Sequence, residues 1–462
     1  MFDPERLRQR REDIARRWRD LRGPVVVPSG LLVPIAGTDQ FHDYHAHNEH
    51  YYLSGNDQPG SVVAYDPREG WTLFAPVASQ EDRVWIGDSI DFETLRERSG
   101  IEQVRPIAAL SGWLEQRRGE PLALLGNPDL VGNPGGYGLE NWAALEVEVD
   151  DEVSHRLSEA ISEARRTKDE GELALMRQAA AASREGHLAG LRLARPGMTE
   201  RQLQVEIEVE FFRNGAARTA YGSIVGTGPN GAVLHFAPTN RPLQDGDIVL
   251  VDAGAEIGGY ASDVTRTFPV APRFDGFQRD LYQLVLNVQE QAIRDARPGK
   301  EYKELHLEAS AGIAAGLADL GILRGRPADL VERDAHALFF PHGLGHMLGL
   351  ATHDAGGCLA GRTPSDRFGL KWLRADLPLR PGYVVTIEPG IYFIRAILED
   401  PAHREAFGEM VNWDRVDRLL DFGGIRIEDD ILVTDGAAEV LSADIPKQID
   451  EIEVLRQEAA AP

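Results

Sequence analysis

Two segments of twelve residues, 243–254 and 379–390, repeat one pattern in widely separated parts of the chain. Leucine, glycine, valine, an acid and glycine recur at identical offsets, and the two acids are Asp252 and Glu388. Each segment predicts a turn, a β-branched strand, and then an acid beside a glycine turn. An acid at the end of an apolar strand needs a partner, because burying an uncompensated charge is unfavourable. The repeat therefore predicts a duplicated fold in which the acids converge on one cation.

A shorter repeat, Ala-Arg-Pro-Gly at residues 194–197 and 296–299, separates two predicted helices in each half. After the first copy, Thr199 and Gln202 are typical of a capping box that starts a helix. Each following helix carries an apolar stripe at helical spacing, which supports the duplication. The stripes are Leu203, Ile207 and Phe211 in the first half, and Leu305, Ile313, Leu317 and Leu320 in the second.

The length of 462 residues predicts two domains, since a single hydrophobic core rarely grows so large. Strand-like runs alternate with helical stretches in residues 1–155, which predicts an N-terminal α/β domain. A charged helical segment, residues 156–195, leads into a duplicated domain at residues 165–445, and residues 446–462 are expected to form a tail. The expected fold class is α/β (α+β), with the smaller α/β domain preceding the duplicated one.

The net charge of −25 argues against nucleic acid or an anionic membrane as a partner, because phosphate binding requires clustered Lys and Arg. The Arg-rich run Arg6–Arg22 contains acids and apolar residues as well, and it predicts an amphipathic surface helix. No apolar run approaches membrane-spanning length, and the first residues do not resemble a signal peptide. A single cysteine, Cys358, excludes a disulfide framework and indicates a reducing compartment. The sequence therefore predicts a cytoplasmic protein.

Asp252 and Asp263 flank a predicted hairpin whose turn is Gly258–Gly259. Folding at that turn places the two aspartates at facing or diagonal positions on one face. Like charges in that arrangement are destabilising unless a cation lies between them. Alternatively, one aspartate caps the turn and the other is solvated, but the apolar residues around Asp252 argue against this.

The second half supplies comparable acids. Glu388 ends the predicted strand 384–387, and residues 424–430 alternate so that Arg426 and Glu428 share one face. Taken alone, Glu428 is equally consistent with a salt bridge to Arg426 on an exposed face. The hairpin of the first half, with one acid on each of two adjacent strands, favours a metal-ligand role for Glu428.

Histidine is the remaining ligand type in this pattern. His342, His346 and His353 lie close together among glycines and apolar residues, and His235 is a fourth candidate. Four carboxylates with one imidazole form an oxygen-rich donor set that favours Mn²⁺, Co²⁺, Fe²⁺ or Zn²⁺ in a paired site. Paired ions of this kind lower the pKa of water and stabilise a tetrahedral intermediate. The donor set therefore predicts a hydrolase.

Residues from about 165 to 440 resemble the pita-bread metallopeptidases, the group that contains methionine aminopeptidase, aminopeptidase P and prolidase. The resemblance rests on the segments VDAGA, SDVTRTF, HGLGH, IEPGIYF and GGIRIEDD. It implies a pseudo-twofold catalytic domain that cleaves peptides with two divalent metal ions, Mn²⁺ being the expected metal and Co²⁺ or Zn²⁺ the alternatives. The implied metal ligands are Asp252, Asp263, His346, Glu388 and Glu428.

The same resemblance implies roles for the residues around the metals. Glu388 would also shuttle a proton during catalysis. His342 and His353 would stabilise the oxyanion and orient the substrate, while His235 would contact the substrate amide. Tyr221 and Arg426 would orient the metal-binding carboxylates. Relatives of this kind also imply a homodimer.

Arg374 bears on the length of the substrate. Residues 373–382 look most similar to Xaa-Pro dipeptidase, in which the equivalent arginine holds the free carboxylate of the terminal proline. The expected function is therefore hydrolysis of Xaa-Pro dipeptides. Residues 51–60 look closer to the N-terminal domain of aminopeptidase P, which releases one residue from longer Xaa-Pro peptides, although residues 43–50 depart from its usual pattern. The histidines of that stretch, His45, His47 and His50, are expected to shape a substrate channel or, alternatively, to bind another metal.

A metal-free binding module or a non-peptidase enzyme is the remaining alternative, because a fold alone does not determine function. All five expected ligand positions are filled, however, and this favours a peptidase. The expected partners are proline-containing dipeptides or short peptides, and neither nucleic acid nor membrane.

Overall fold

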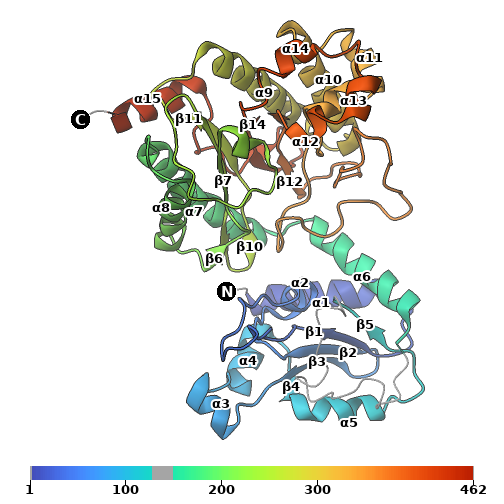
Figure 1. Cartoon of the computed structure of the whole chain (residues 1–462). Helices are drawn as coiled ribbons and strands as arrows, with labels where there is room; N and C mark the ends of the chain where they lie inside the picture. The colour runs from blue at the N-terminus through green and yellow to red at the C-terminus, as the bar shows by residue number, and fades with distance from the viewer. Residues whose placement is uncertain (1–2, 127–148, 461–462) are drawn as a thin grey trace. The chain divides into compact units, whose positions relative to one another are not determined.

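The computed structural model describes residues 3–126 and 149–460. The chain divides into two compact units, residues 1–165 and residues 166–462. Both units combine helices and strands (Figure 1), which confirms the expected mixed fold class.

A five-stranded sheet forms the centre of the first unit, in the order β4-β3-β2-β1-β5. The three middle strands pair antiparallel, whereas β4 and β5 each join an edge in parallel. Phe74 of the sheet packs against Trp113 with ring centroids 5.8 Å apart. The strands are β1 (Val25–Pro28), β2 (Val62–Asp66), β3 (Gly70–Ala75), β4 (Gln103–Pro106) and β5 (Ala123–Leu124). The helices are α1 (Pro4–Arg17), α2 (Asn48–Ser54), α3 (Gln80–Trp85), α4 (Phe92–Ser99), α5 (Leu110–Glu115) and α6 (Asp151–Arg166).

The second unit contains several short sheets between longer helices (Figure 1). Its helices are α7 (Glu170–Leu193), α8 (Glu200–Arg213), α9 (Gly276–Asp295), α10 (Tyr302–Asp319), α11 (Pro327–Glu332), α12 (Arg395–Leu398), α13 (Pro401–Ala406), α14 (Trp413–Val416) and α15 (Ile449–Ala460). Its strands are β6 (Arg218–Thr219), β7 (Ile224–Thr227), β8 (Ile248–Asp252), β9 (Ala255–Ile257), β10 (Tyr260–Ala261), β11 (Thr265–Pro269), β12 (Val384–Ile387), β13 (Gly390–Tyr392), β14 (Gly424–Arg426), β15 (Asp429–Leu432) and β16 (Glu439–Val440).

The repeated segments adopt the same local structure in both halves of the second unit. The backbone N–H of Gly197 donates to the Leu243 carbonyl at 2.9 Å, and that of Gly299 donates to the Leu379 carbonyl at 2.8 Å. Each Ala-Arg-Pro-Gly segment thus holds the start of a twelve-residue repeat. It does so between two helices, α7 and α8 in the first half and α9 and α10 in the second. The two sequence repeats are therefore parts of one duplicated structure.

The strands of each half form two successive antiparallel ladders. In the first half β8 pairs with β11 and β9 with β10, and in the second β12 pairs with β15 and β13 with β14. Gly258 and Gly259, both with positive φ, make the tight turn between β9 and β10 that the sequence predicts. At the equivalent place in the second half, residues 393–423 connect β13 to β14 and contain α12, α13 and α14.

The predicted stripe of α8 faces the core of the second unit. Leu203, Ile207 and Phe211 are completely buried, and Thr199 caps the helix through the predicted box with Gln202. In Figure 1, α7 and α8 lie against the strands of the first half, whereas α9 packs on those of the second. Each half of the second unit therefore packs its own helices on its own strands.

The end of the described chain is part of this core. Residues 446–462 were expected to form a tail, but Ile449–Ala460 make the helix α15. Ile449 and Ile452 of this helix are buried in the same cluster as α8, because they lie on its apolar side. Arg456 is also buried.

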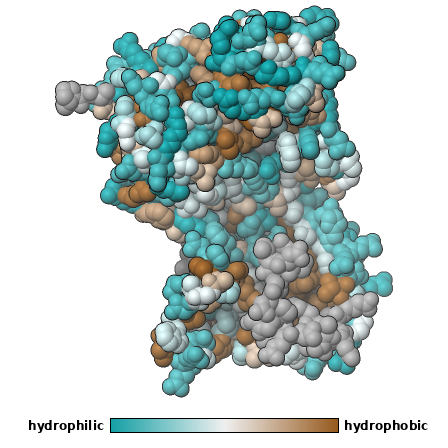
Figure 2. All heavy atoms as spheres, viewed as in Figure 1, coloured by the Kyte–Doolittle hydropathy of each residue, from teal (hydrophilic) through white to brown (hydrophobic). Residues whose placement is uncertain are grey.

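On the face shown in Figure 2, hydrophilic residues cover most of the surface and apolar residues appear between them in small groups. No described helix has the length and apolar character needed to cross a membrane.

Two neighbouring phenylalanines test the predicted stripe. Replacing the completely buried Phe211 with alanine should lower the free energy of unfolding by about 3–5 kcal/mol, because it leaves a cavity in the core. The same change at Phe212, which is 51% exposed, should alter it by less than about 0.5 kcal/mol. Urea denaturation followed by circular dichroism measures both, and equal losses would contradict the assigned helix face.

Candidate metal centre

All the candidate residues of the duplicated domain line one pocket of the second unit. Its volume is about 850 Å³. The predicted residues in its wall are Tyr221, His235, Asp252, Asp263, His342, His346, His353, Arg374, Glu388, Arg426 and Glu428.

The four acids occupy equivalent places in the two halves. Asp252 ends β8 and Glu388 directly follows β12, each just before the inner ladder begins. Asp263 lies between β10 and β11, and Glu428 lies between β14 and β15, where the chain returns to the outer ladder. Thr265 pairs with Asp252 across the ladder, so that Asp263 is the diagonal neighbour that the hairpin predicts. The breaks between ladders therefore bring acids from both halves into one pocket.

Three of the predicted ligands form a compact group. One ligand atom from each of Asp263, His346 and Glu428 lies within 4.8 Å of the others. The Nε2 atom of His346 lies 3.3 Å from Oδ2 of Asp263 and 3.5 Å from Oε1 of Glu388. Its Nδ1 atom lies 3.0 Å from the Met347 carbonyl, a contact in which only the nitrogen can donate. This bond orients Nε2 toward the carboxylates, as outer hydrogen bonds do for metal-binding histidines.

The loop that carries His346 runs alongside β12. Glu388 N–H donates to the Leu344 carbonyl at 2.8 Å, and Thr386 N–H donates to the His346 carbonyl at 3.0 Å. A side chain at Gly345 would collide with the Thr386 backbone and with the Tyr302 hydroxyl. Glycine at this position therefore permits the close approach that places His346 beside Glu388.

Asp252 is held by two predicted partners. The Tyr221 hydroxyl donates to its Oδ1 at 2.6 Å, and the Arg426 guanidinium donates to its Oδ2 at 2.6 Å. The alternative in which Arg426 merely pairs with Glu428 on an exposed face is not observed, because both side chains are buried and Arg426 bonds Asp252. Glu428 instead accepts a hydrogen bond from the Thr265 hydroxyl at 2.6 Å.

Burial raises the pKa of two acids of this pocket, Glu388 and Glu428. It raises the pKa of Glu388 to about 7, helped by Asp263 and Asp252, although His346 and Arg426 oppose the shift. Burial and the neighbouring acids also raise the pKa of Glu428 well above its usual value. Burial opposes the charged form of His346, but Asp263 and Glu388 raise its pKa to about 9. The group therefore favours added positive charge, which a divalent cation supplies without protons.

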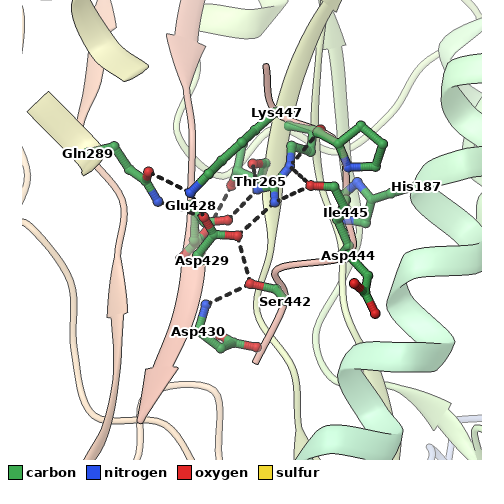
Figure 3. Close-up of polar contacts among 12 residues, drawn as sticks. His187, Thr265, Gln289, Glu428, Asp429, Asp430, Ser442, Asp444, Ile445 and Lys447 are labelled. Carbon is green, nitrogen blue, oxygen red and sulfur yellow. Dashed lines mark hydrogen bonds and ion pairs between the residues drawn. The ribbon is translucent and has the colours of Figure 1, made fainter. Parts of the chain in front are cut away.

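The neighbouring Asp429 is a buried carboxylate whose negative charge is compensated by protein side chains (Figure 3). Its carboxylate accepts hydrogen bonds from Arg266 at 2.7 Å, Lys447 at 2.6 Å and Gln289 at 2.8 Å. Burial raises the pKa of Asp429, but the charges of Arg266 and Lys447 hold that pKa below its usual range. Within the described residues, the Glu428 carboxylate accepts from the neutral Thr265 hydroxyl and has no hydrogen bond from a Lys or Arg side chain, so its oxygens are better suited to a metal ion than those of Asp429.

Several residues of the site were missed by sequence reasoning. Tyr392 accepts a hydrogen bond from Arg426 at 2.8 Å and lies 2.8 Å from Nε2 of His342. Thr265 links Arg426 to Glu428, and Asp430 accepts from the backbone N–H of Asp263 at 3.1 Å. Tyr392 and Thr265 lie within the segments IEPGIYF and SDVTRTF, so that proximity to the predicted ligands was the available signal.

The outer histidines surround the compact group. Both ring nitrogens of His342 are engaged, Nδ1 with the Gly343 carbonyl at 2.8 Å and Nε2 with Tyr392. Burial and Arg426 lower the pKa of His342 to about 3, which keeps the ring neutral. His353 is exposed, and its ring lies 4.4 Å from that of His346. His235 and Arg374 are exposed in the pocket wall, where a substrate can reach them.

The predicted histidine cluster of the first unit, His45, His47 and His50, does not form a comparable group. Among the described residues, only the group of Asp263, His346 and Glu428 brings three ligand atoms together. His50 is buried, and its Nδ1 lies 3.0 Å from the Val27 carbonyl. His47 precedes α2 as its N-cap residue.

A buried acid outside the predictions holds the loop that presents His235. Glu200, at the start of α8, is completely buried. One of its oxygens accepts hydrogen bonds from Thr227 and Asn230, and the other accepts from Thr239 at 2.7 Å. These partners lie at the two ends of the segment 231–238, most of which has no regular structure. One carboxylate thereby joins both ends of a substrate-facing loop.

Comparison with known proteins finds two matching families. Metallopeptidase family M24 matches residues 174–435, and the aminopeptidase P N-terminal domain matches residues 7–121. A probable Xaa-Pro aminopeptidase of Botryotinia fuckeliana is 33% identical over 460 residues, covering 98% of this chain and 96% of the relative. One from Aspergillus fumigatus is 34% identical over 461 residues, covering 93% of this chain and 91% of the relative.

Solved structures of the same kind match the whole chain. The aminopeptidase PepP of Pseudomonas aeruginosa has a TM-score of 0.81 at 29% identity, with 99% of each chain covered. Zn-substituted aminopeptidase P of E. coli in complex with product has a TM-score of 0.81 at 29% identity, with 100% of each chain covered.

These matches overturn the expectation of an Xaa-Pro dipeptidase. The relatives are Xaa-Pro aminopeptidases, and the match to the aminopeptidase P N-terminal domain covers the segment whose pattern had appeared mixed. That expectation depended on Arg374. Its guanidinium is exposed in the wall of a pocket of about 850 Å³, a volume within the range of sites for ligands larger than a dipeptide.

Metal binding should weaken as the pH falls. Glu388, with a pKa of about 7, and His346, with a pKa of about 9, must both lose a proton to bind an ion, so that the affinity for Mn²⁺ should fall by more than about tenfold between pH 8 and pH 6. Isothermal titration calorimetry of the metal-depleted protein measures this. Asp263→Asn should abolish binding, whereas Asp245→Asn, outside the pocket, should not change it. An affinity independent of pH would contradict the assignment.

Glu200→Gln should loosen the loop that presents His235. The amide cannot accept on both sides as the carboxylate does, and buried donors lose partners. Amide hydrogen exchange in residues 231–239 should accelerate by about tenfold or more. Glu206→Gln, an exposed change on the same helix, is the matched control. Equal exchange in the two variants would show that Glu200 does not hold the loop.

Proposed function

Because the chain belongs to metallopeptidase family M24, we propose that it is an Xaa-Pro aminopeptidase, which releases the first residue of peptides whose second residue is proline. The observation that carries this proposal is the near full-length similarity to Xaa-Pro aminopeptidases, at 33% and 34% identity over 98% and 93% of the chain. The matched N-terminal domain supports it, because it belongs to the same class of enzyme.

The donor set suits two divalent metal ions, and we propose Mn²⁺. The residues that would hold them are Asp252, Asp263, His346, Glu388 and Glu428. Carboxylate oxygens with one imidazole favour such hard or borderline cations over thiolate-bound metals. When bound, a metal pair supplies a nucleophile derived from water and stabilises charge on the peptide carbonyl.

The chain's own residues orient this chemistry. Glu388 has a more exposed side chain than three of the other ligands, with 17% exposed against 13% for Asp252, 6% for Asp263 and 5% for His346. This exposure suits Glu388 for proton transfer to and from substrate. Arg426 holds both Asp252 and the Tyr392 hydroxyl, and Tyr392 in turn fixes the neutral ring of His342. The exposed His235 and His353 are available to bind the peptide.

The length of the preferred substrate tests the proposal. With Mn²⁺ added, kcat/KM for Ala-Pro-Ala should exceed that for Ala-Pro by about tenfold or more, because contacts with the leaving chain contribute to transition-state binding. Ala-Ala-Ala serves as the control without proline and should be cleaved slowly. Chromatographic detection of released alanine measures all three.

The opposite ranking would contradict the aminopeptidase proposal. Failure to cleave any Xaa-Pro peptide with Mn²⁺, Co²⁺ or Zn²⁺ would instead favour a binding module or a different enzyme.

A further inference from the structure

The connection between β13 and β14 has no counterpart in the first half of the duplicated unit. There, Gly258 and Gly259 alone join the equivalent strands, which is the minimum that a hairpin needs. In the second half, residues 393–423 stand between the strands and contain α12, α13 and α14. The pairing of β9 with β10 shows that such a ladder forms without an insertion, so we asked what else the inserted residues contact.

The insertion is firmly packed. Leu398, Val411 and Val416 are buried in the core of the unit. Asn412 N–H donates to the Ile322 carbonyl at 2.9 Å, and the Met410 carbonyl accepts from Arg324 N–H at 2.7 Å. These contacts fix the insertion on the segment that follows α10. It is therefore a rigid element rather than a loose loop.

The start of the insertion forms part of the pocket wall. Ile394 and Ile397 both line the pocket and are half-buried. Ile394 belongs to one apolar cluster with Leu234 and Phe236, next to Tyr392. We call these four side chains, Leu234, Phe236, Ile394 and Ile397, the apolar wall; all four line the pocket.

A second set of contacts connects the apolar wall to another segment that lines the pocket. The Ile397 carbonyl lies 3.0 Å from Nδ1 of His403, which donates to it. The His403 ring stacks on Phe368 with centroids 5.2 Å apart. Phe368 precedes Trp372 and Arg374, which also line the pocket. The insertion thus holds the apolar wall in a fixed relation to the segment that carries Arg374.

We propose that the apolar wall binds an apolar side chain at the third position of the peptide, the residue that follows proline. The inference builds on the proposed function. An aminopeptidase substrate has one residue before the scissile bond and the rest of its chain after it, so that the pocket has to hold both the first side chain and the leaving chain; we assign the apolar wall to the leaving chain because it is tied to the segment that carries Arg374. Half-buried apolar side chains gain free energy when another apolar group removes them from water. The insertion accordingly makes this chain selective for apolar residues after proline.

The test compares leucine with asparagine, which is similar in shape but polar, at the third position. In the wild-type protein with Mn²⁺, kcat/KM for Ala-Pro-Leu should exceed that for Ala-Pro-Asn by about tenfold or more. Ile397→Asn should reduce this ratio to about threefold or less, and Ile397→Val should leave an intermediate ratio. Val454→Asn, an exposed change on α15, is the matched control and should keep the wild-type ratio.

The alternative is that the apolar wall binds the side chain of the first residue of the peptide. If Ile397→Asn changes the ratio between Leu-Pro-Gly and Asn-Pro-Gly and not the ratio at the third position, the wall serves the first residue and the proposal is overturned. A wild-type ratio near one at the third position overturns it as well.

Binding separates this inference from the proposed function. Calorimetry should show that Pro-Leu binds the Mn²⁺-loaded protein about tenfold more tightly than Pro-Asn, and that Ile397→Asn reduces the difference. If no peptide is cleaved but this preference holds, the proposed activity fails and the apolar subsite stands. If the two dipeptides bind equally and Xaa-Pro peptides are still cleaved, the apolar subsite is overturned and the proposed aminopeptidase activity stands.

Discussion

Electrostatic repulsion among buried carboxylates is the constraint on which the second unit depends. Asp252, Asp263, Glu388 and Glu428 come from four separate strand ends, and burial raises the pKa of Glu388 and Glu428. The fold brings them together because two copies of one strand arrangement each place an acid where the outer ladder gives way to the inner one. Such a cluster is unfavourable by itself and becomes favourable when cations lie within it.

Much of this arrangement could be predicted from the sequence because the repeats are local patterns with a direct structural meaning. A glycine pair forces a hairpin, a capping box starts a helix, and an acid after an apolar strand marks a compensated charge. The stripe Leu203, Ile207 and Phe211 and the turn at Gly258 are both observed as predicted. The predicted candidates of the duplicated domain likewise line one pocket, and Asp252 and Glu388, which have the same offset in the two repeats, occupy equivalent places in the fold.

What could not be predicted depends on contacts between distant segments. Tyr392 and Thr265 bond Arg426 and Glu428 only after both halves have folded, and their residue types are ordinary for strands, so that closeness to the predicted ligands in the sequence was the one available signal. The length of the substrate was misjudged for a similar reason. An arginine such as Arg374 binds a carboxylate equally well at the end of a short or a long peptide, and only the surrounding space distinguishes the two.

The connections of the two inner hairpins differ in length, and only the longer one contributes side chains to the wall of the pocket. In the first half, two glycines join β9 to β10. In the second half, the folded insertion of residues 393–423 joins β13 to β14, and these two strands still pair with each other. The inner ladder thus forms whether its strands are joined by two glycines or by residues 393–423. An ancestral scaffold of this design could acquire new peptide preferences by lengthening one bend, and protein engineers have the same freedom.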